Sequence, residues 1–293
     1  MMQEISTLPS LPSLLSVTAL GDSDSSTNPG SAIKINARAS ADFDAKLAKT
    51  QALLVQAARD YAPESEGAAR RITQASSLGA EDMVISHLIN QLPLSLVNSI
   101  GIFVLETGQL HAQTLQVLAE LKETSRAPVD VYHPLHEQVV QFVAREGNDA
   151  MYKSIDLRKA CCGIRKMEPL ERALAGKKAW ITGLRREQSG ARAEVPMTDT
   201  SDAKRVKLNP LADWTWGDVW HYISINQVAY NPLHDQFFPS IGCAPCTRAI
   251  SLGEDFRAGR WWWEDEAAKE CGLHVPTSVR AEPAEARNEE ESV

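Results

Sequence analysis

The fold of this chain is decided by residues 71–82, Arg71-Ile72-Thr73-Gln74-Ala75-Ser76-Ser77-Leu78-Gly79-Ala80-Glu81-Asp82. Residues 71–76 are typical of a short strand, residues 76–82 of a loop, and the apolar periodic stretch Met83–Leu92 predicts a helix. A loop between a strand and a helix brings backbone N–H groups and a helix N-terminus to one point, which suits a phosphate. On this pattern alone, an ordinary strand-to-helix turn is the alternative.

The same alternation continues along the chain. Residues 100–105 form a buried-type strand, Glu106-Thr107-Gly108 is the loop, and residues 111–121 have helical periodicity. A third strand at 129–132 is followed by a helix at 135–145. Strands that alternate with helices predict an α/β fold, in which a parallel sheet with right-handed crossovers is flanked by helices. Ligands of such sheets bind beyond the carboxyl ends of the strands, where the first two loops fall.

A further strand, residues 179–182, runs into Gly183-Leu184-Arg185-Arg186-Glu187-Gln188-Ser189. Two adjacent arginines after a strand are able to fork onto an oxyanion, and a solvated charge pair is the alternative. Residues 206–210 are expected to form the last strand, after which Asp213 is expected to cap a helix. The buried stripe of that helix, which we expect to be core, consists of Trp216, Val219, Trp220 and Ile223.

The composition limits the class of protein. A chain of 293 residues with 43% hydrophobic and 23% charged residues is an ordinary globular composition. The net charge of −8 argues against non-specific nucleic-acid binding, so local Lys and Arg must meet any anionic substrate. No apolar run approaches the roughly 20 residues of a membrane helix, and Met1–Leu20 lacks the basic start of a secretory signal. We expect a cytoplasmic protein with no membrane partner; its oligomeric state, including a homo-oligomer, stays open.

The chain divides into three parts by composition. Residues 1–36, rich in Ser, Pro, Leu and Thr, are expected to be a disordered or loosely attached arm. Residues 37–264 carry the strand and helix patterns and form one α/β domain. Residues 265–293 are expected to be a mobile C-terminal segment that is disordered at its polar, acidic end.

Five cysteines indicate metal or redox chemistry. Cys161 and Cys162 are adjacent, and Cys243 and Cys246 form a Cys-x-x-Cys turn. Four thiolates suit either Zn²⁺ or an iron–sulfur cluster. Because two adjacent residues do not easily place both sulfurs about 2.3 Å from one tetrahedral ion, geometry favours a 4Fe-4S cluster over zinc. A set of buried free thiols is the remaining alternative.

The fifth cysteine, Cys271, stands apart in Glu270-Cys271-Gly272-Leu273-His274. A free cysteine near His274 and two arginines is placed where its thiolate is favoured. Cys271 lies beside sequence that we expect to be disordered, which suggests a mobile segment that docks on the domain and dissociates again. Such a segment would deliver a nucleophilic thiolate to an electrophilic substrate. An unreactive cysteine is the alternative.

Several motifs together resemble the bacterial assimilatory adenylyl-sulfate reductases, relatives of the phosphoadenylyl-sulfate reductases. The resemblance extends from about Ser76 to His274 and includes the Cys-Cys pair, the Cys-x-x-Cys turn and the Glu-Cys-Gly-x-His ending. The other motifs are Ser76-Ser77-Leu78-Gly79-Ala80-Glu81-Asp82-Met83, Glu106-Thr107-Gly108, Gly163-Ile164-Arg165-Lys166-Met167-Glu168-Pro169-Leu170, Gly183-Leu184-Arg185-Arg186-Glu187-Gln188-Ser189 and Arg257-Ala258-Gly259-Arg260-Trp261-Trp262-Trp263-Glu264.

The resemblance implies an adenine-nucleotide α-hydrolase-like fold and a reaction of assimilatory sulfate reduction, on the way to cysteine. One 4Fe-4S cluster would be held by Cys161, Cys162, Cys243 and Cys246. Cys271 would attack the sulfur of adenylyl sulfate, giving an S-sulfocysteine and AMP, and thioredoxin or a similar dithiol would then release sulfite.

The resemblance also assigns residues to the substrate. Its sulfate would be surrounded by Lys166, Arg257, Arg260 and His274. Its nucleotide would be held by Ser76, Ser77, Leu78, Gly79, Glu81, Glu106, Thr107, Gly108, Arg185 and Arg186. The family's turn is usually Asp-Thr-Gly followed by Arg, whereas this chain has Glu106 and Gln109, so we expect altered affinity at that contact.

Two other functions are weighed. A reductase of the 3′-phosphorylated nucleotide is less consistent with the four paired cysteines, which members using that substrate mostly lack. A non-catalytic nucleotide-binding module stabilised by zinc or a cluster is less consistent with Cys271 and His274.

Overall fold

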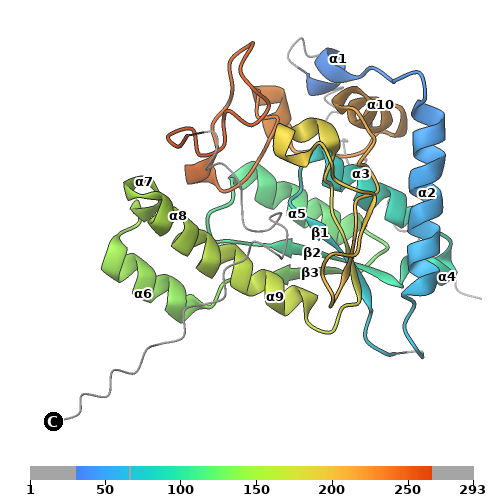
Figure 1. Cartoon of the computed structure of the whole chain (residues 1–293), viewed down its shortest axis with the longest axis horizontal. Coiled ribbons are helices and arrows are strands. Elements are labelled where there is room, and N and C mark those ends of the chain that lie inside the picture. The colour runs from blue at the N-terminus through green and yellow to red at the C-terminus, as the bar shows by residue number, and fades with distance from the viewer. Residues whose placement is uncertain (1–30, 66, 266–293) are drawn as a thin grey trace, which may run out of the picture.

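The computed structural model describes residues 31–65 and 67–265, and a six-stranded sheet lies at the centre (Figure 1). The strands are β1 (Ile72–Ser76), β2 (Ile100–Leu105), β3 (Val129–Tyr132), β4 (Ala179–Ile181), β5 (Thr198–Asp199) and β6 (Val206–Leu208). Their order is β3-β2-β1-β4-β6-β5, and all neighbours are parallel except β5, which pairs antiparallel with β6 at one edge. The predicted α/β class is confirmed. β5 was not predicted because two residues carry no readable periodicity.

Helices alternate with the strands as the sequence indicates. They are α1 (Ala32–Asn36), α2 (Phe43–Asp60), α3 (Ala80–Asn90), α4 (Leu94–Val97), α5 (Ala112–Thr124), α6 (His136–Glu146), α7 (Ala150–Lys153), α8 (Ile155–Cys162), α9 (Glu168–Leu174) and α10 (Trp216–Asn226). A π-helical turn, Gly163–Met167, joins α8 to α9. Among residues 31–65 and 67–265, no helix is both long enough and apolar enough to cross a membrane.

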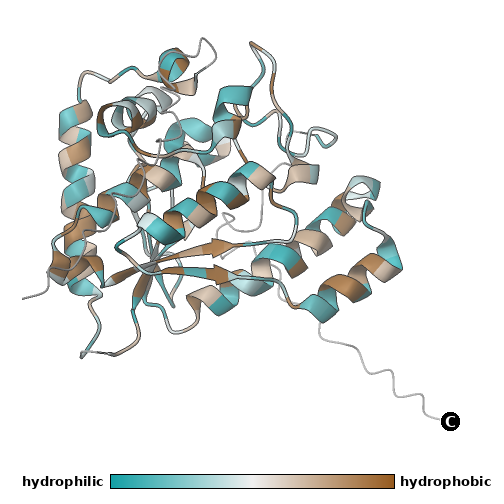
Figure 2. Cartoon of the chain, turned by 180° about the vertical axis from the view of Figure 1, so that it is seen from behind, coloured by the Kyte–Doolittle hydropathy of each residue, from teal (hydrophilic) through white to brown (hydrophobic). Residues whose placement is uncertain are grey.

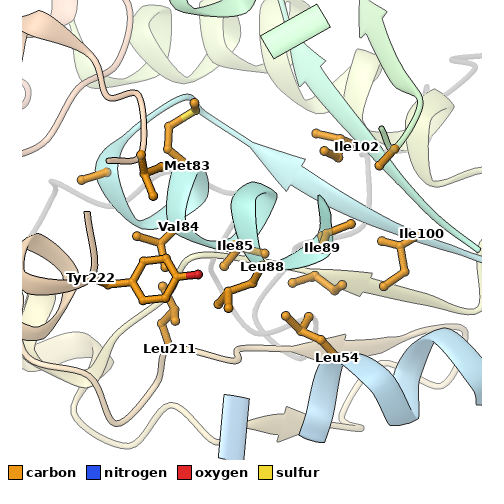
Figure 3. Close-up of a cluster of buried hydrophobic side chains, with 14 of the residues drawn as sticks. Leu54, Met83, Val84, Ile85, Leu88, Ile89, Ile100, Ile102, Leu211 and Tyr222 are labelled. Atoms are coloured by element: carbon orange, nitrogen blue, oxygen red, sulfur yellow. The ribbon is translucent and has the colours of Figure 1, made fainter. Parts of the chain in front are cut away.

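The main core lies between the sheet, α3, α2 and α10. The strands are largely apolar and appear brown in Figure 2. Against them are buried the α3 side chains Met83, Val84, Ile85, Leu88 and Ile89. Figure 3 shows that Leu54 of α2 and Ile100 and Ile102 of β2 close this cluster. Each such side chain contributes roughly 1.5–3 kcal/mol when it is fully buried. This core fixes the strand–loop–helix unit at residues 71–90.

Helix α10 begins differently from the prediction. Its N-cap is Thr215, whose Oγ1 accepts the Asp218 N–H at 3.0 Å while Asp218 accepts the Thr215 N–H at 2.9 Å, which makes a capping box. Asp213 is therefore not the cap; it accepts hydrogen bonds from Lys49 and Arg186 instead. The predicted buried stripe of this helix is otherwise present, although Trp216 is only half-buried.

The N-terminal boundary of the ordered domain also differs. The arm was expected to reach residue 36, but α1 packs on α10 and the Ala32 N–H donates to Asp235 Oδ1 at 2.7 Å. The ordered domain therefore includes residues 31–36. The rest of the predicted arm and the segment from residue 266 onward, with Cys271 and His274, lie outside the described residues.

Beyond the carboxyl ends of β2 and β3 lies a helical lobe made of α6, α7 and α8 (Figure 1). It has its own small core, which consists of Phe142, Ala150, Met151, Cys161, Cys243, Cys246 and Trp261. Three of these seven residues are predicted cluster cysteines. The lobe therefore brings the two distant cysteine pairs together at the same end of the sheet as the loops that follow β1 and β2.

Candidate active site

A cavity of about 200 Å³ opens at the carboxyl end of the sheet. The strand order reverses between β1 and β4, because the chain runs from β1 outward to β3 and then returns to β4 on the other side of β1. Such a reversal leaves a crevice between the loops that follow the two strands, where ligands of α/β sheets bind. Ser76 and Ser77 after β1 and Thr182 and Gly183 after β4 line this cavity.

The loop after β1 is held in a tight turn. Leu78 has a left-handed backbone (φ 62°), and its N–H donates to Ser76 Oγ at 3.2 Å. Asp82 accepts the Ser77 N–H at 2.6 Å and the Ser77 hydroxyl at 2.7 Å. Burial raises the pKa of Asp82 to about 6, and the nearby Glu81 adds to this effect against the Ser77 hydrogen bonds. The turn therefore presents the loop's backbone to the cavity from a rigid frame.

Most of the predicted loop residues line the cavity. Ser76, Ser77, Gly79 and Glu81 are in its wall, and so is Asp82, which was not assigned a role. Leu78 is fully buried in the main core instead, so it anchors the loop from behind.

The two adjacent arginines contact carboxylates rather than the cavity. Arg185 Nε donates to Glu81 Oε1 at 2.9 Å, and Arg185 Nη1 donates to Glu187 Oε2 at 2.9 Å. Arg186 pairs with Asp213 and donates to the carbonyl of Val195. Arg185 is only 1% exposed, so it is also no solvated charge. The predicted oxyanion fork is thus occupied by the protein's own carboxylates.

Two residues that the sequence reasoning missed take their place in the cavity wall. Gln188 donates to Glu81 Oε1 at 3.0 Å and accepts from Arg192 Nη1 at 2.7 Å, and both Gln188 and Arg192 line the cavity. Gln188 lies inside the quoted Arg-Arg motif, which offered a signal. Arg192 lies beyond it, in a 3₁₀ turn that carried none.

The three cations assigned to the sulfate by the resemblance all line this cavity: Lys166, Arg257 and Arg260. Arg260 is buried, its Nη1 lies 3.3 Å from Ser240 Oγ, and its Nε has no hydrogen-bond acceptor among the described residues. A Cβ on Gly242 would lie 2.5 Å from Arg260 Nη2, so only glycine leaves room for this guanidinium. A buried cation with an unmet donor on a cavity wall is suited to an anionic ligand.

All four predicted ligand cysteines line one small second cavity. Lys166 and Trp261 line both cavities, so the cysteines lie directly behind the cationic wall. Burial raises the pKa of Cys161, although Arg165 and Lys166 oppose this effect, and burial with the neighbouring Cys243 raises the pKa of Cys246 to about 11. No three His, Cys, Asp or Glu side chains within residues 31–65 and 67–265 converge to hold a single metal ion.

The turn Glu106-Thr107-Gly108 connects the sheet to the cysteines. Thr107 Oγ1 lies 3.3 Å from Cys243 Sγ, and Arg165 Nη1 donates to the Thr107 carbonyl at 2.7 Å. Glu106 accepts the Gly108 N–H at 2.8 Å, where φ is 70°, and its other oxygen lies 3.0 Å from His133 Nδ1. Of the three predicted residues, only Thr107 lines the larger cavity.

These contacts account for Glu106 in the family's turn, whereas Gln109 is bonded here through its backbone and its side chain is not explained. Both carboxylate oxygens of Glu106 are used within the protein, one for the turn and one for His133. Gln109 uses its carbonyl to accept the Ala244 N–H at 2.7 Å, beside the second cysteine pair. The longer side chain of Glu106 therefore stabilises the turn at a distance from the substrate cavity.

Comparison with known proteins identifies the class that this fold and site define. The sequence profile of the family described as the phosphoadenosine phosphosulfate reductase domain matches residues 71–249, from β1 to just beyond the second cysteine pair. This chain belongs to that family of reductases.

Three curated relatives narrow the class. An adenosine 5′-phosphosulfate reductase of Burkholderia cepacia is 48% identical over 84% of this chain and 93% of its own length. Proteins of the same name from Allochromatium vinosum and Neisseria meningitidis serogroup A are 49% and 50% identical, over 73% and 71% of this chain and 84% of their own lengths.

Two solved structures confirm the fold. A phosphoadenylyl-sulfate reductase from Candida auris has a TM-score of 0.53 at 24% identity, covering 71% of this chain and 98% of its own. An FMN adenylyltransferase from Candida glabrata has a TM-score of 0.51 at 12% identity, covering 82% of both chains. The predicted nucleotide-hydrolase-type sheet is thus shared with other proteins of known structure.

Proposed function

We propose that this chain is a thiol-dependent reductase that converts adenylyl sulfate to sulfite and AMP. The observation that carries the proposal is the shared wall. Lys166 and Trp261 line both the cavity at the strand-order reversal and the cavity of the four cysteines. The names of the curated relatives support adenylyl sulfate as the substrate.

The cavity offers complementary surfaces to the two halves of such a substrate. Its lining includes apolar side chains that suit an adenine ring: Phe103, Leu105, Leu170, Trp180, Leu184 and Phe256. Lys166, Arg257 and Arg260 are suited to the phosphate and sulfate oxygens, where negative charge develops during the reaction. In a largely water-excluded wall, preorganised cations of this kind stabilise the transition state more strongly than they would in water.

The chemical step is assigned to the C-terminal segment, residues 265–293, whose Cys271 and His274 lie outside the described residues. The Cys271 thiolate attacks the sulfur of the sulfate group, so that an S–S bond forms, the S–O bond to phosphate breaks and AMP leaves with the electron pair. A thiolate of thioredoxin or a similar dithiol then attacks Cys271 Sγ, and sulfite leaves as a mixed disulfide forms. The second thiol of the dithiol attacks this mixed disulfide, closes the partner's own disulfide and expels the Cys271 thiolate. The dithiol is oxidised, and sulfur is reduced from sulfate to sulfite.

A 4Fe-4S cluster fits the cysteines, Cys161, Cys162, Cys243 and Cys246. All four line one cavity, and the adjacent Cys161 and Cys162 suit separate iron atoms better than one tetrahedral zinc. Arg165 and Lys166 lie close to these thiols and balance the negative charge that four thiolates bring. When bound, the cluster adjusts the charge beside Lys166; the two-electron sulfur chemistry needs no electron from it.

The covalent step is tested by trapping. Wild-type protein incubated with adenylyl sulfate and no reductant is expected to gain one SO₃ on the peptide that contains Cys271, measured by mass spectrometry. Cys271→Ser is expected to bind AMP normally and to release no sulfite. Sustained sulfite production by Cys271→Ser contradicts the covalent mechanism.

The cluster and the substrate are tested separately. Purified protein is expected to be brown, with about four irons per chain and a broad absorption near 400 nm. A colourless protein with one zinc would instead favour a non-catalytic module. The ratio of kcat/KM for adenylyl sulfate and its 3′-phosphorylated form decides the substrate, and a preference for the latter would assign a phosphoadenylyl-sulfate reductase.

A further inference from the structure

The indole of Trp261 contacts two guanidinium groups. Arg158 Cζ is 4.7 Å from the centre of the ring, and Arg260 Cζ is also 4.7 Å from it. Arg158 comes from α8, one turn before Cys161, whereas Arg260 lines the substrate cavity. Trp261 is 1% exposed and has a left-handed backbone (φ 43°), a costly conformation for a bulky residue that surrounding contacts must maintain.

Glu264 fixes the first of these guanidinium groups. Arg158 Nε donates to Glu264 Oε1 at 2.9 Å and Arg158 Nη2 to Glu264 Oε2 at 2.7 Å, and the two side chains are only 1% and 2% exposed. A buried bidentate pair has one geometry, and removal of either partner leaves an uncompensated charge. The guanidinium of Arg158 is therefore held in one orientation, in contact with the Trp261 indole.

The second guanidinium depends on the same indole. The hydrogen bonds of Arg260 to protein acceptors are long, 3.3 Å to Ser240 Oγ and 3.4 Å to the Ile241 carbonyl, and its Nε finds no acceptor in the described part of the chain. Its plane is instead set by Trp261 on one side and by Gly242, where no side chain intervenes. Glu264 neutralises Arg158 but not Arg260, whose charge is left for the cavity.

We propose that Arg158, held by Glu264, is a positioning residue that acts through Trp261 to orient Arg260 toward the sulfate group. This inference rests on the proposed function, since it assumes a sulfonucleotide in the larger cavity. Arg158 itself lines the cysteine cavity and not the larger one. It acts on the substrate through the ring that it supports.

The test compares two nucleotides that differ by the sulfate. In a Cys271→Ser background, which prevents turnover, equilibrium binding of AMP and of adenylyl sulfate is measured for Glu264→Gln and Arg158→Lys. Both variants are expected to lose about tenfold in affinity for adenylyl sulfate, as when a charge-assisted hydrogen bond is lost, and less than about twofold for AMP. Iron content and the unfolding temperature are recorded for each variant.

A matched control lies in the same loop region. Arg248 and Glu254 form a second bidentate pair, at 2.9 and 2.7 Å, which is partly exposed and contributes to the wall of neither cavity. Glu254→Gln is expected to leave both affinities unchanged. Arg260→Lys is expected to reproduce the selective loss, and the double variant Glu264→Gln/Arg260→Lys is expected to lose no more than Arg260→Lys alone.

Three results contradict the inference. Additive losses in the double variant mean that Glu264 does not act through Arg260. Equal losses for AMP and adenylyl sulfate, or a loss of iron or folding in both variants, mean a structural role only. Unchanged affinities mean no role. If parental protein with intact Arg158 and Glu264 binds adenylyl sulfate no better than AMP, the proposed function fails first, whatever the variants do.

Discussion

The sheet and the helical lobe of α6–α8 are held together by different means. The main core of the sheet consists of aliphatic and aromatic side chains contributed by neighbouring strands and helices, among them Ile85, Ile89 and Ile102. The core of the lobe has seven buried residues, three of which are cysteines from segments about 80 residues apart. The first core is stabilised by the burial of apolar surface alone. The second includes thiols that line a small cavity, where we have proposed a cluster.

This difference teaches where the protein depends on a cofactor. Apolar burial stabilises the sheet whatever the cavity contains. In the lobe, burial alone raises the pKa values of Cys161 and Cys246, which opposes the thiolates that metal binding requires. Arg165 and Lys166 oppose this rise at Cys161, and the proposed cluster would favour the thiolates further. The sheet is expected to fold independently of iron, and the lobe is not.

The largest effect is expected from Cys246→Ser, which removes one proposed cluster ligand. Turnover is expected to fall by more than about 100-fold, with loss of iron and of the brown colour. Amide hydrogen exchange is expected to increase in α6–α8 but not in β1, β2 or α3, because only the lobe depends on the cluster. A variant that keeps four irons per chain would refute the ligand assignment.

A core substitution in the sheet tests whether the sheet can be destabilised without loss of iron from the lobe. Ile102→Ala deletes a fully buried side chain of β2 and is expected to lower the free energy of unfolding by about 2–4 kcal/mol. Iron content and the visible spectrum are expected to be unchanged. Urea unfolding followed by circular dichroism measures the loss, and Leu115→Ala on the exposed side of α5 is the matched control. Parallel loss of iron would show that the two regions are coupled.

A pH titration measures how much the buried carboxylate of Asp218 contributes to the stability of the sheet domain. Burial alone would raise the pKa of Asp218, but hydrogen bonds from Ser40 and Thr215 and the ammonium of Lys46 lower it from 3.8 to about 2. Because the folded-state pKa is depressed, the stabilisation is complete above about pH 4 and is lost as the pH falls through 2. The expected size of this loss is about 2 kcal/mol.

Asp218→Asn tests this sign. The variant is expected to be less stable near neutral pH and to show a flatter stability profile between pH 4 and pH 2, measured by urea unfolding. Asp44→Asn, on the exposed face of α2, is the control. An unchanged slope in Asp218→Asn would assign the acid loss to other carboxylates.

The smallest effect is expected at the surface of the lobe. Tyr152 donates its hydroxyl to the Pro245 carbonyl at 2.6 Å, and its ring lies 4.5 Å from that of Trp263. Tyr152→Phe removes a hydrogen bond of about 1 kcal/mol that holds the Cys-x-x-Cys turn. Iron release to a chelator is expected to quicken a few-fold. Tyr230→Phe, which removes a hydroxyl bonded to Asp235 on the sheet side, is expected to leave the rate unchanged.

The sequence predicted the sheet region well because its signals are local. The strands at 72–76, 100–105 and 129–132 and the helices that follow them lie where alternation and periodicity indicate. The cap of α10 was misplaced because Asp213 and Thr215 are both good capping residues, and only the reciprocal bonds of Asp218 distinguish them. The parallel sheet and its ligand-binding end were predicted, but the order of the strands, with the reversal between β1 and β4, comes from the structure.

The site was predicted in kind but not in every contact. The cysteines, Lys166, Arg257 and Arg260 are brought together as expected because each sits in a dense motif. The ion pair of Arg185 with Glu81 was not predicted because the two residues are 104 positions apart, and a sequence does not reveal a long-range ion pair. Arg192 and the Arg158–Glu264 pair were missed for the same reason: isolated charged residues resemble solvated ones until the fold buries them.

The π-helical turn at Gly163–Met167 has a consequence for how this protein can change. The Glu168 N–H reaches back five residues to the Gly163 carbonyl, so the continuous rod from α8 to α9 holds one residue more than a regular helix would. The wider turn absorbs this extra residue, so α8 and α9 keep nearly the phase of one regular helix. Deleting a residue of the regular part before Leu170, such as Pro169, would rotate Leu170 against the thiols by about 100°. Either the thiols or Leu170 in the substrate wall would then face the wrong way. The rotation of Leu170 relative to the thiols thus depends on the number of residues between them. Insertions and deletions change that number, whereas point substitutions do not.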